Sequence, residues 1–222
     1  PTQFNDVNDL DKYPRTLERD MELLEGFCDV VFFPESPSEV YGNEIVLKDY
    51  DFNGLDEVLE GEFRPGHFKG MANVVSKFFS VVEPDYAFFG LKDYQQYLLV
   101  KNMVEIDKHS VEIVGCDIVR EDNGLAMSSR NERLSKAGRE GASVIKYTLD
   151  YCSRYYSFFD INVIKEKAKN MIEGILEVEY LEFRNANTLQ LIKEDEEMDS
   201  FLICFAGYID GVRLIDNTVV AV

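Results

Sequence analysis

Helix-like and strand-like patterns alternate through the central part of this chain of 222 residues. Apolar residues recur every three or four positions over residues 71–82, which predicts a helix with one buried face. After Pro84, residues 86–89 form a short, wholly apolar run, typical of a parallel strand that is covered on both faces. A second helix is expected from Asp93 to about residue 106, and residues 111–114 form the next apolar run. This strand, helix, strand order predicts a right-handed crossover in a parallel sheet.

The same alternation is expected upstream, where a helix around residues 17–28 precedes a buried strand at residues 30–33. Open parallel sheets bind ligands in the crevice beyond the carboxyl ends of their strands. The central strand ends at Gly90. The ligand crevice is therefore expected around residues 90–93.

The pattern changes after Arg120. Two long helices are expected at residues 135–155 and 162–176, followed by strand-like segments at residues 178–183, 201–208 and 212–215, the last two joined by a turn at Asp210 and Gly211. The chain is therefore predicted to be an α/β protein with two domains. Residues 1–119 would form a Rossmann-like domain around a parallel sheet, and residues 120–222 a smaller α+β domain with antiparallel strands.

The composition supports a folded core and argues against some partners. Hydrophobic residues make up 45% of the chain and aromatic residues 13%, enough to bury a core. The net charge is −19, so a nucleic-acid partner, which needs a basic surface, is not expected. No apolar stretch reaches transmembrane length, so we expect no membrane partner and a cytoplasmic location. The cysteines lack metal-ligand spacing and are predicted to be buried free thiols: Cys28, Cys116, Cys152 and Cys204.

Two segments carry side chains that suit a triphosphate. Lys92 follows a predicted strand directly, which places a point charge over the crevice. Ser128, Ser129 and Arg130 offer two hydroxyl donors and a guanidinium that binds two oxygens at once, and Gly124 supplies a hinge for their loop. A cation about 4 Å from one phosphate charge contributes on the order of 4 kcal/mol at an effective dielectric constant of about 20. We therefore expect the two segments to meet around one bound triphosphate.

Six collinear stretches of the chain match one family. They are residues 1–4, 11–16, 64–68, 90–96, 121–131 and 212–217. In these stretches the chain resembles the pantothenate synthetases, ligases that use ATP to join pantoate to β-alanine. The resemblance implies a homodimer in which each smaller domain closes over a nucleotide-binding domain.

The resemblance also implies that the chain starts inside the family's Asn-Pro-Thr-Gln-Phe segment. The family's first strand, its first helix and a His-containing loop that binds ATP phosphates precede that segment, and the loop is similar to the HIGH motif of class I aminoacyl-tRNA synthetases. His67 and His109 do not lie in such a loop. We therefore interpret the chain as a truncated member with part of the site and little activity alone. A sheet without its first strand exposes an edge, so either another polypeptide supplies the strand or the chain is prone to aggregate.

The resemblance assigns site residues position by position. For ATP it implies Gly90, Leu91, Lys92, Asp93, Val119, Met127, Ser128, Ser129 and Arg130, and for catalysis Lys92, Ser128, Ser129 and Arg130 among them. Gln3 and Gln96 match glutamines that bind pantoate, and Gln3 also lies near β-alanine in the family. Arg64 and His67 are expected to help close the pantoate pocket. No carboxylate cluster predicts a metal site, so Mg²⁺ is expected to be held mainly by the ATP phosphates and water.

Some of these residues also suit purely structural roles. Asp93 and Ser128 are residue types that cap helices. The side chain of Val119 would fit a strand core, and Met127 is a common filler of irregular gaps. Gln95, next to the assigned Gln96, is expected on a helix surface.

The predicted activity is a ligation in two steps. Pantoate attacks the α-phosphorus of ATP and releases pyrophosphate, and the amine of β-alanine then attacks the pantoyl adenylate and releases AMP. Two alternatives stay open: a non-catalytic module that binds pantoate or nucleotide, and another nucleotidyl transferase that acts on a different small carboxylate. Leu91 and Asn123 depart from the family pattern, which usually has Glu and Asp there. Both changes remove an acid beside the expected phosphate site, and they therefore bear on nucleotide affinity or metal handling.

Overall fold

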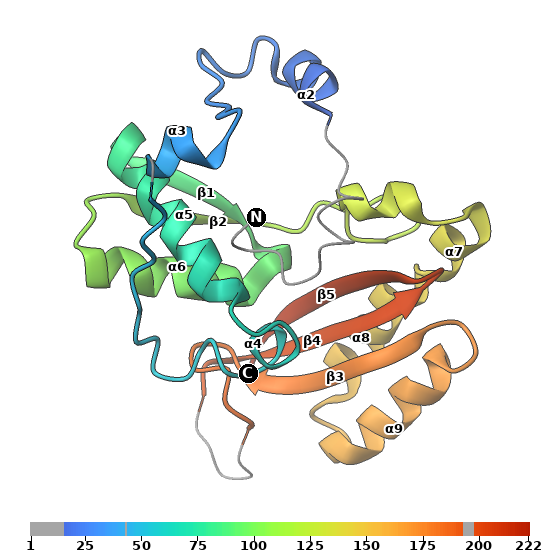
Figure 1. Ribbon diagram of the computed structural model, residues 1–222. Coiled ribbons are helices and arrows are strands. Elements are labelled where there is room, and N and C mark those ends of the chain that lie inside the picture. The colour runs from blue at the N-terminus through green and yellow to red at the C-terminus, as the bar shows by residue number, and fades with distance from the viewer. Residues whose placement is uncertain (1–15, 43, 193–197) are drawn as a thin grey trace.

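The computed structural model describes residues 16–42, 44–192 and 198–222, and these form two lobes (Figure 1). The first lobe contains a two-stranded parallel sheet, in the order β1-β2. The second contains a three-stranded antiparallel sheet, in the order β3-β4-β5. The predicted α/β fold, with a parallel sheet followed by antiparallel strands, is confirmed.

The first lobe is built as helix, strand, helix, strand: α5 (His67–Val82), β1 (Tyr86–Gly90), α6 (Tyr94–Asp107) and β2 (Glu112–Cys116). The two strands run parallel, with Tyr86 opposite Glu112. Met71 of α5 and Leu99 of α6 are buried in one core that packs on the sheet. The predicted strand, helix, strand unit with parallel strands is therefore confirmed.

One face of this sheet is exposed in the described structure. Side chains alternate along a strand, so residues 86 and 88 share one face of β1 and residues 87 and 89 the other. Ala87 and Phe89 pack against the core. Tyr86 and Phe88 are 57% and 68% exposed. The expectation that both faces of β1 are covered is therefore wrong for the residues that the structure describes.

Two short helices precede this lobe in the chain: α2 (Leu17–Leu24) and α3 (Pro37–Tyr41). The helix expected around residues 17–28 is confirmed over its first part, but the strand expected at residues 30–33 does not form. Phe32 instead meets Phe78 of α5 edge to face, with ring centroids 5.8 Å apart. An apolar run becomes a strand only beside another strand that offers backbone partners, and here its neighbour is a helix.

The described part of the second lobe follows the order α7 (Lys136–Gly141), α8 (Val144–Tyr155), α9 (Ile161–Ile172), β3 (Glu177–Asn185), β4 (Ser200–Ile209) and β5 (Val212–Ala221). The single long helix expected before α9 is thus divided in two. Gly141 lowers the helix propensity at the division. The hydroxyl of Ser143 donates to the carbonyl of Glu140 at 2.7 Å, a local bond that competes with helical pairing.

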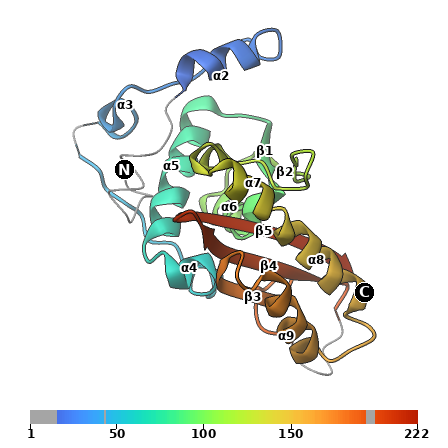
Figure 2. The same cartoon turned by 90° about the vertical axis from the view of Figure 1, so that its right-hand side faces the viewer.

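Both faces of the antiparallel sheet are buried (Figure 2). One face packs against the first lobe, and the other packs against the helices of the sheet's own lobe. Tyr180, Leu202 and Ile215 pack in the core that the sheet shares with α5 and α6. Leu181 and Ile203 point the other way, into a second core with α8 and α9. Burial on both sides explains why β4 is an unbroken apolar run in the sequence.

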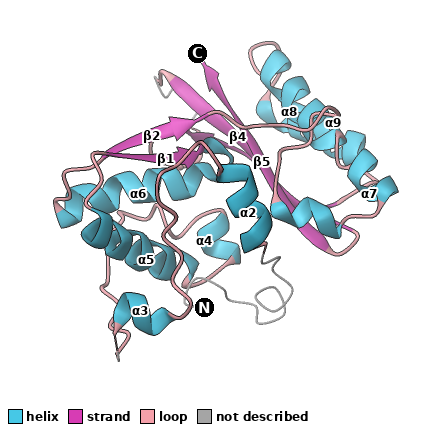
Figure 3. Ribbon diagram, turned by 90° about the horizontal axis from the view of Figure 1, so that it is seen from above, coloured by secondary structure: helices cyan, strands magenta, loops and turns pink. Residues whose placement is uncertain are grey.

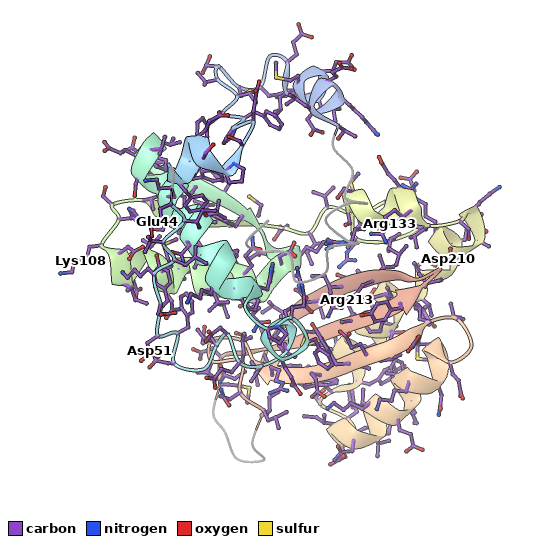
Figure 4. All side chains as sticks on the ribbon, viewed as in Figure 1. Glu44, Asp51, Lys108, Arg133, Asp210 and Arg213 are labelled. Carbon is purple, nitrogen blue, oxygen red and sulfur yellow. The ribbon has the colours of Figure 1, made fainter. Side chains whose placement is uncertain are left out.

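The hairpin between β4 and β5 turns at Asp210 and Gly211, whose φ angles are 54° and 70°. This is the predicted two-residue turn. Asp210 lies at the tip beside α7 (Figure 4), where its Oδ2 accepts from the amide and hydroxyl of Ser135 at 2.9 and 2.7 Å. A Cβ on Gly138 would lie 2.0 Å from this carboxylate, so only glycine permits the approach. The hairpin tip is thereby fixed to the start of α7.

The cysteines divide into two classes. Cys152 and Cys204 are buried free thiols, as predicted, and burial raises the pKa of Cys152 to about 12. Cys28 and Cys116 are exposed, so the prediction is wrong for them. Cys28 follows the end of α2 and Cys116 ends β2, where neither is enclosed by a core. None of the described helices combines the length and apolar character that a bilayer crossing requires.

Candidate functional site

A short 3₁₀ helix, η1 (Leu91–Asp93), follows β1 directly and leads into α6. Lys92 is half-buried in its middle, at the carboxyl end of the strand. Asp93 occupies the position before α6, but its side chain makes no capping hydrogen bond. Lys92 therefore lies where a parallel sheet is expected to bind its ligand.

A pocket between the two lobes brings several predicted residues together. Lys92, Asp93 and Gln96 line it from η1 and the start of α6. Arg64 and His67 line it from the turn that opens α5. The opposite wall comes from the antiparallel sheet through Tyr180, Cys204, Ile215, Asp216 and Asn217.

A buried ion-pair network around Glu60, on α4 (Glu60–Phe63), forms one wall of this pocket. Arg213, labelled on β5 in Figure 4, donates to both Glu60 oxygens at 2.7 Å. Arg213 also pairs with Glu179, and the Tyr180 hydroxyl donates to Glu60 at 2.8 Å. Burial alone would raise the pKa of Glu60, but hydrogen bonds and charge from Arg213 hold it below its usual value. Charge-assisted bonds therefore join the two lobes beside the pocket.

Arg64 lies next to this network. Its Nη1 is 3.7 Å from Glu60 Oε2 and 3.1 Å from His67 Nε2. The contacts between Arg213 and Glu60 are shorter, so Arg213 does most to neutralise that carboxylate. Arg64 lines the pocket, with the buried His67 beside it.

Gln95 is a structural residue of the pocket wall. It is 5% exposed, so the expectation that it lies on a helix surface is wrong. Its Oε1 accepts from the backbone of Glu60 at 3.0 Å, and its Nε2 donates to the carbonyls of Leu55 and Val58 at 2.6 and 2.7 Å. Gln95 therefore holds the segment that carries Glu60 against α6.

The loop that carries Ser128, Ser129 and Arg130, called the serine-rich loop from here on, does not line this pocket. Ser128 directly precedes a second 3₁₀ helix, η2 (Ser129–Arg133), and neither Ser128, Ser129 nor Arg130 is among the residues that line the pocket. The hydroxyl of Ser128 accepts from the amide of Arg130 at 3.3 Å, which is the predicted helix cap. Gly124 has a φ of 91°, a conformation that favours glycine.

Val119 and Met127 are joined by their backbones, with Met127 N donating to Val119 O at 2.9 Å. Their side chains are 67% and 55% exposed. The alternative of Val119 as a strand-core residue is therefore wrong, since β2 has already ended at Cys116. Both side chains lie on the surface of the loop region.

Ion pairs fasten the serine-rich loop at its start. Arg120 donates to both oxygens of Asp216 at 2.6 and 3.0 Å, and also to the carbonyl of Gly124 at 3.0 Å. Glu121 accepts two bonds from Arg139 of α7 at 2.7 and 2.8 Å. The Arg139 hydrogen bonds are the main cause of a lowered Glu121 pKa. The loop is thus tied to β5 on one side and to α7 on the other.

The two departures from the family pattern have structural uses. Asn123 donates to the carbonyl of Arg139 and accepts from the amide of Leu125, both at 3.0 Å. A carboxylate could not make the first of these bonds. Leu91 packs over Gly115, where a Cβ would lie 2.8 Å from the leucine.

β5 contacts both 3₁₀ helices and supplies two buried polar residues between them. Asn217 Nδ2 donates to the carbonyls of Leu91 and Lys92 at 2.9 and 2.8 Å. Asp216 holds Arg120. The strand thus connects the Lys92 segment to the base of the serine-rich loop.

Sequence reasoning missed the structural residues of this site. Arg213, Asp216 and Asn217 offered a signal, because they are polar residues in or directly after a strand-like run and lie in one of the six matching stretches. Glu60 lies outside those stretches, and no pattern in the sequence marked it as a residue of the site. Gln3 lies outside the described residues, so its place beside pantoate stays a prediction. Over the described ranges, no three His, Cys, Asp or Glu side chains gather in a way that would hold a metal ion.

Comparison with known sequences identifies the family. A sequence model described as Pantoate-beta-alanine ligase matches residues 1–219. The chain is 43% identical over 222 residues to the pantothenate synthetase of Christiangramia forsetii, covering 98% of this chain and 78% of the relative. It is 44% identical over 220 residues to that of Bacteroides thetaiotaomicron, covering 98% and 77%.

Solved structures agree with the sequence matches. The pantothenate synthetase of Thermus thermophilus superposes with a TM-score of 0.90 at 33% identity, covering 98% of this chain and 79% of that one. The pantoate-beta-alanine ligase of Francisella tularensis, complexed with beta-gamma ATP and β-alanine, superposes with a TM-score of 0.76 at 31% identity, covering 98% and 75%. The chain therefore belongs to the pantoate-beta-alanine ligase family, whose members named here are pantothenate synthetases.

Proposed function

We propose that the chain condenses pantoate with β-alanine in an ATP-dependent reaction that passes through a pantoyl adenylate. The observation that carries the proposal is the pocket between the lobes, where Lys92, Gln96 and Arg64 converge in a member of this ligase family. The relative from Francisella tularensis was crystallised with beta-gamma ATP and β-alanine, which supports the same classes of ligand here.

An amine cannot displace an oxygen from a free carboxylate, because that oxygen is a very poor leaving group. Forming the adenylate replaces it with AMP, which leaves readily. A pantoate oxygen attacks the α-phosphorus of ATP, and the bond to pyrophosphate breaks. The amine of β-alanine, having lost a proton, then attacks the acyl carbon, and AMP leaves with the electrons of the acyl–oxygen bond. The protein positions these reactants and neutralises the charge that develops on the phosphates.

Lys92 is assigned to the phosphates. Its position after β1 puts a mobile point charge at the carboxyl end of the sheet, and Gly90, Leu91 and Asp93 are assigned to the nucleotide beside it. Mg²⁺ would enter as part of the MgATP substrate, held by the phosphates and water, which would leave the residues of η1 to bind the phosphates directly.

Gln96 and Arg64 are assigned to the two acids. An amide both donates and accepts, which suits the hydroxyl and carboxylate of pantoate. The guanidinium of Arg64 lines the same pocket and is a group that binds carboxylates well. Gln3 belongs to the same assignment.

Ser128, Ser129 and Arg130 are assigned to the β- and γ-phosphates after a movement of their loop. Gly124 and the exposed anchor between Glu121 and Arg139 support such a movement. Val119 and Met127, whose side chains are exposed beside this loop, would then lie next to the nucleotide base.

The test is whether the chain forms AMP from ATP, pantoate and β-alanine. AMP is measured with a coupled enzyme assay or by chromatography. Release of AMP that requires both acids supports the proposal. ATP and pantoate binding without AMP would instead favour a non-catalytic module, and AMP formation with a different acid would favour another nucleotidyl transferase. We also propose a homodimer, which light scattering coupled to gel filtration tests directly.

A further inference from the structure

The side chains of β5 alternate between the two lobes. Arg213, Ile215 and Asn217 point to the first lobe, where they meet Glu60, the shared core and η1. Asp216 points the other way, to Arg120 at the base of the serine-rich loop. This follows from the two-residue period of a strand. One strand therefore holds both segments that carry the proposed phosphate ligands.

Asn217 fixes the backbone of η1. It is 4% exposed, and its Nδ2 bridges the carbonyls of Leu91 and Lys92 at 2.9 and 2.8 Å. Two consecutive carbonyls held by one amide set the direction of the peptides on both sides of the Lys92 Cα. The direction in which the Lys92 side chain leaves the turn is set with them.

Asp216 fixes the base of the loop from the neighbouring position. It is 3% exposed and accepts two bonds from Arg120, whose Nη1 also holds the carbonyl of Gly124. Its Oδ1 accepts from the amide of Asn217 at 2.8 Å, so the two residues are coupled directly. The spacing between η1 and the loop base is thus set by one rigid strand.

We propose that Asn217 and Asp216 are positioning residues for ATP: Asn217 aims Lys92 at the phosphates, and Asp216 holds the loop base at the distance from which Ser128 to Arg130 close. This role rests on the proposed function, since it needs ATP in the pocket. Neither residue touches the reacting atoms, and both act through the segments that they hold.

The chain offers a closely matched control for Asn217. Asn73 is also buried, at 8% exposed, and its Nδ2 also bridges two carbonyls, those of Lys48 and Lys69, at 2.9 and 2.8 Å. It lies outside the pocket between the lobes. Asn217→Asp and Asn73→Asp therefore remove the same pair of bonds and place the same carboxylate against two carbonyl oxygens, one inside the proposed site and one outside it.

The experiment measures MgATP affinity by calorimetry and hydrogen exchange of residues 90–94 in the full chain. Asn217→Asp is expected to weaken MgATP binding roughly tenfold or more and to speed exchange over 90–94. Asn73→Asp is expected to change both by less than about twofold, although it removes equivalent bonds. In a Lys92→Met background Asn217→Asp should cause no further loss of affinity, because its effect passes through Lys92.

A second arm tests Asp216. Asp216→Asn keeps the volume of the side chain but removes the charge that holds Arg120, so it should weaken MgATP binding several-fold. In an Arg130→Met background the same substitution should weaken MgATP binding by less. Equal weakening by Asn217→Asp and Asn73→Asp would overturn the positioning role, because general loosening would then explain both. Unchanged affinity in Asn217→Asp would overturn it too. A wild-type chain that binds no MgATP is a different failure, because it refutes the proposed function before any variant is compared.

Discussion

The two regions assigned to ATP are held in contrasting ways. The wall of the pocket between the lobes is fixed by a buried network, in which Glu60 is 8% exposed and Arg213 joins it to the opposite lobe. The two lobes that this network joins lie side by side when the molecule is seen from above (Figure 3). The serine-rich loop is fastened to α7 by Glu121 and Arg139, whose side chains are 15% and 47% exposed. The base of the loop is buried at Asp216, whereas its attachment to α7 is open to solvent at Arg139.

Under the proposed function, this difference separates a preformed part of the site from a part that moves. A buried charge pair is costly to break, because each partner is left without compensation. An exposed pair contributes little, because water and salt screen it. The pocket wall is therefore expected to keep its geometry with or without substrate, while the loop turns about its buried base. Substitutions in the pocket wall should reduce activity or stability most, and substitutions at the anchor between Glu121 and Arg139 should reduce activity least.

Lys92 should show the largest effect on activity. Lys92→Met keeps the length of the side chain and removes the charge from the phosphates, which costs on the order of 4 kcal/mol of transition-state binding, or roughly a thousandfold in kcat/KM for ATP. Steady-state AMP formation measures it. Lys101→Met, an exposed change on the same α6, is the control. A loss below about tenfold would remove Lys92 from the phosphate site.

Glu60 should show the largest effect on stability. Glu60→Gln keeps the shape and the bond from Tyr180 but leaves Arg213 without one of its two carboxylates, so the free energy of unfolding should fall by about 2 kcal/mol. Urea unfolding measures this loss. Glu62→Gln, on the exposed side of the same α4, should change it little. Equal midpoints for both variants would show that the network does not hold the wall.

The same carboxylate predicts a pH dependence. The pKa of Glu60 is lowered in the folded chain, so its stabilising contribution is complete above its unfolded pKa, near 4.5, and is lost as the pH falls through the folded value. Urea midpoints from about pH 6 to about pH 3 should therefore drop more steeply in the wild type than in Glu60→Gln. Parallel curves would mean that Glu60 titrates alike in both states.

Individual helices and strands were largely predictable from the sequence. Which elements lie side by side in the fold was less predictable. The helical period and the apolar runs located α5, β1, α6 and β2, because these elements bury one face or follow one another directly. The run at residues 30–33 is wholly apolar, like residues 86–89 of β1, but its Phe32 lies against Phe78 of α5. The apolar pattern of a segment predicts that it is buried on one or both faces. It does not show whether a strand or a helix lies beside the segment in the folded chain.

The site shows the same limit. Lys92 was predictable because a strand end fixes its place, and the Asp210 turn because its backbone demands particular residues. The bonds of Glu60 to Arg213 and of Arg120 to Asp216 join residues 153 and 96 positions apart. No local pattern couples such positions. Gln95 and Gln96 both line the pocket, but the Gln95 amide is taken up by backbone hydrogen bonds, and the sequence does not tell these neighbours apart.

Arg130 belongs to the movable part, and its geometry should matter more than its charge. Arg130→Lys keeps the charge but loses the planar fork that binds two phosphate oxygens. We expect kcat/KM for ATP to fall roughly tenfold, about 1.4 kcal/mol, with pantoate affinity unchanged. Arg154→Lys, exposed on α8, is the control. An equal loss of ATP and pantoate binding would place Arg130 in the fixed pocket instead.

The exposed anchor between Glu121 and Arg139 should show the smallest effect and the clearest salt dependence. Glu121→Gln and Arg139→Gln each break the pair that ties the loop to α7, so each should raise the KM for ATP by about twofold to threefold at low ionic strength. The double variant should be no worse than either single one, because both remove the same interaction. At about 1 M salt the wild type should lose its advantage, since the screening length is then about 3 Å. A single variant that abolished activity would contradict the contrast, because the outer anchor would then be as essential to the site as the buried network around Glu60.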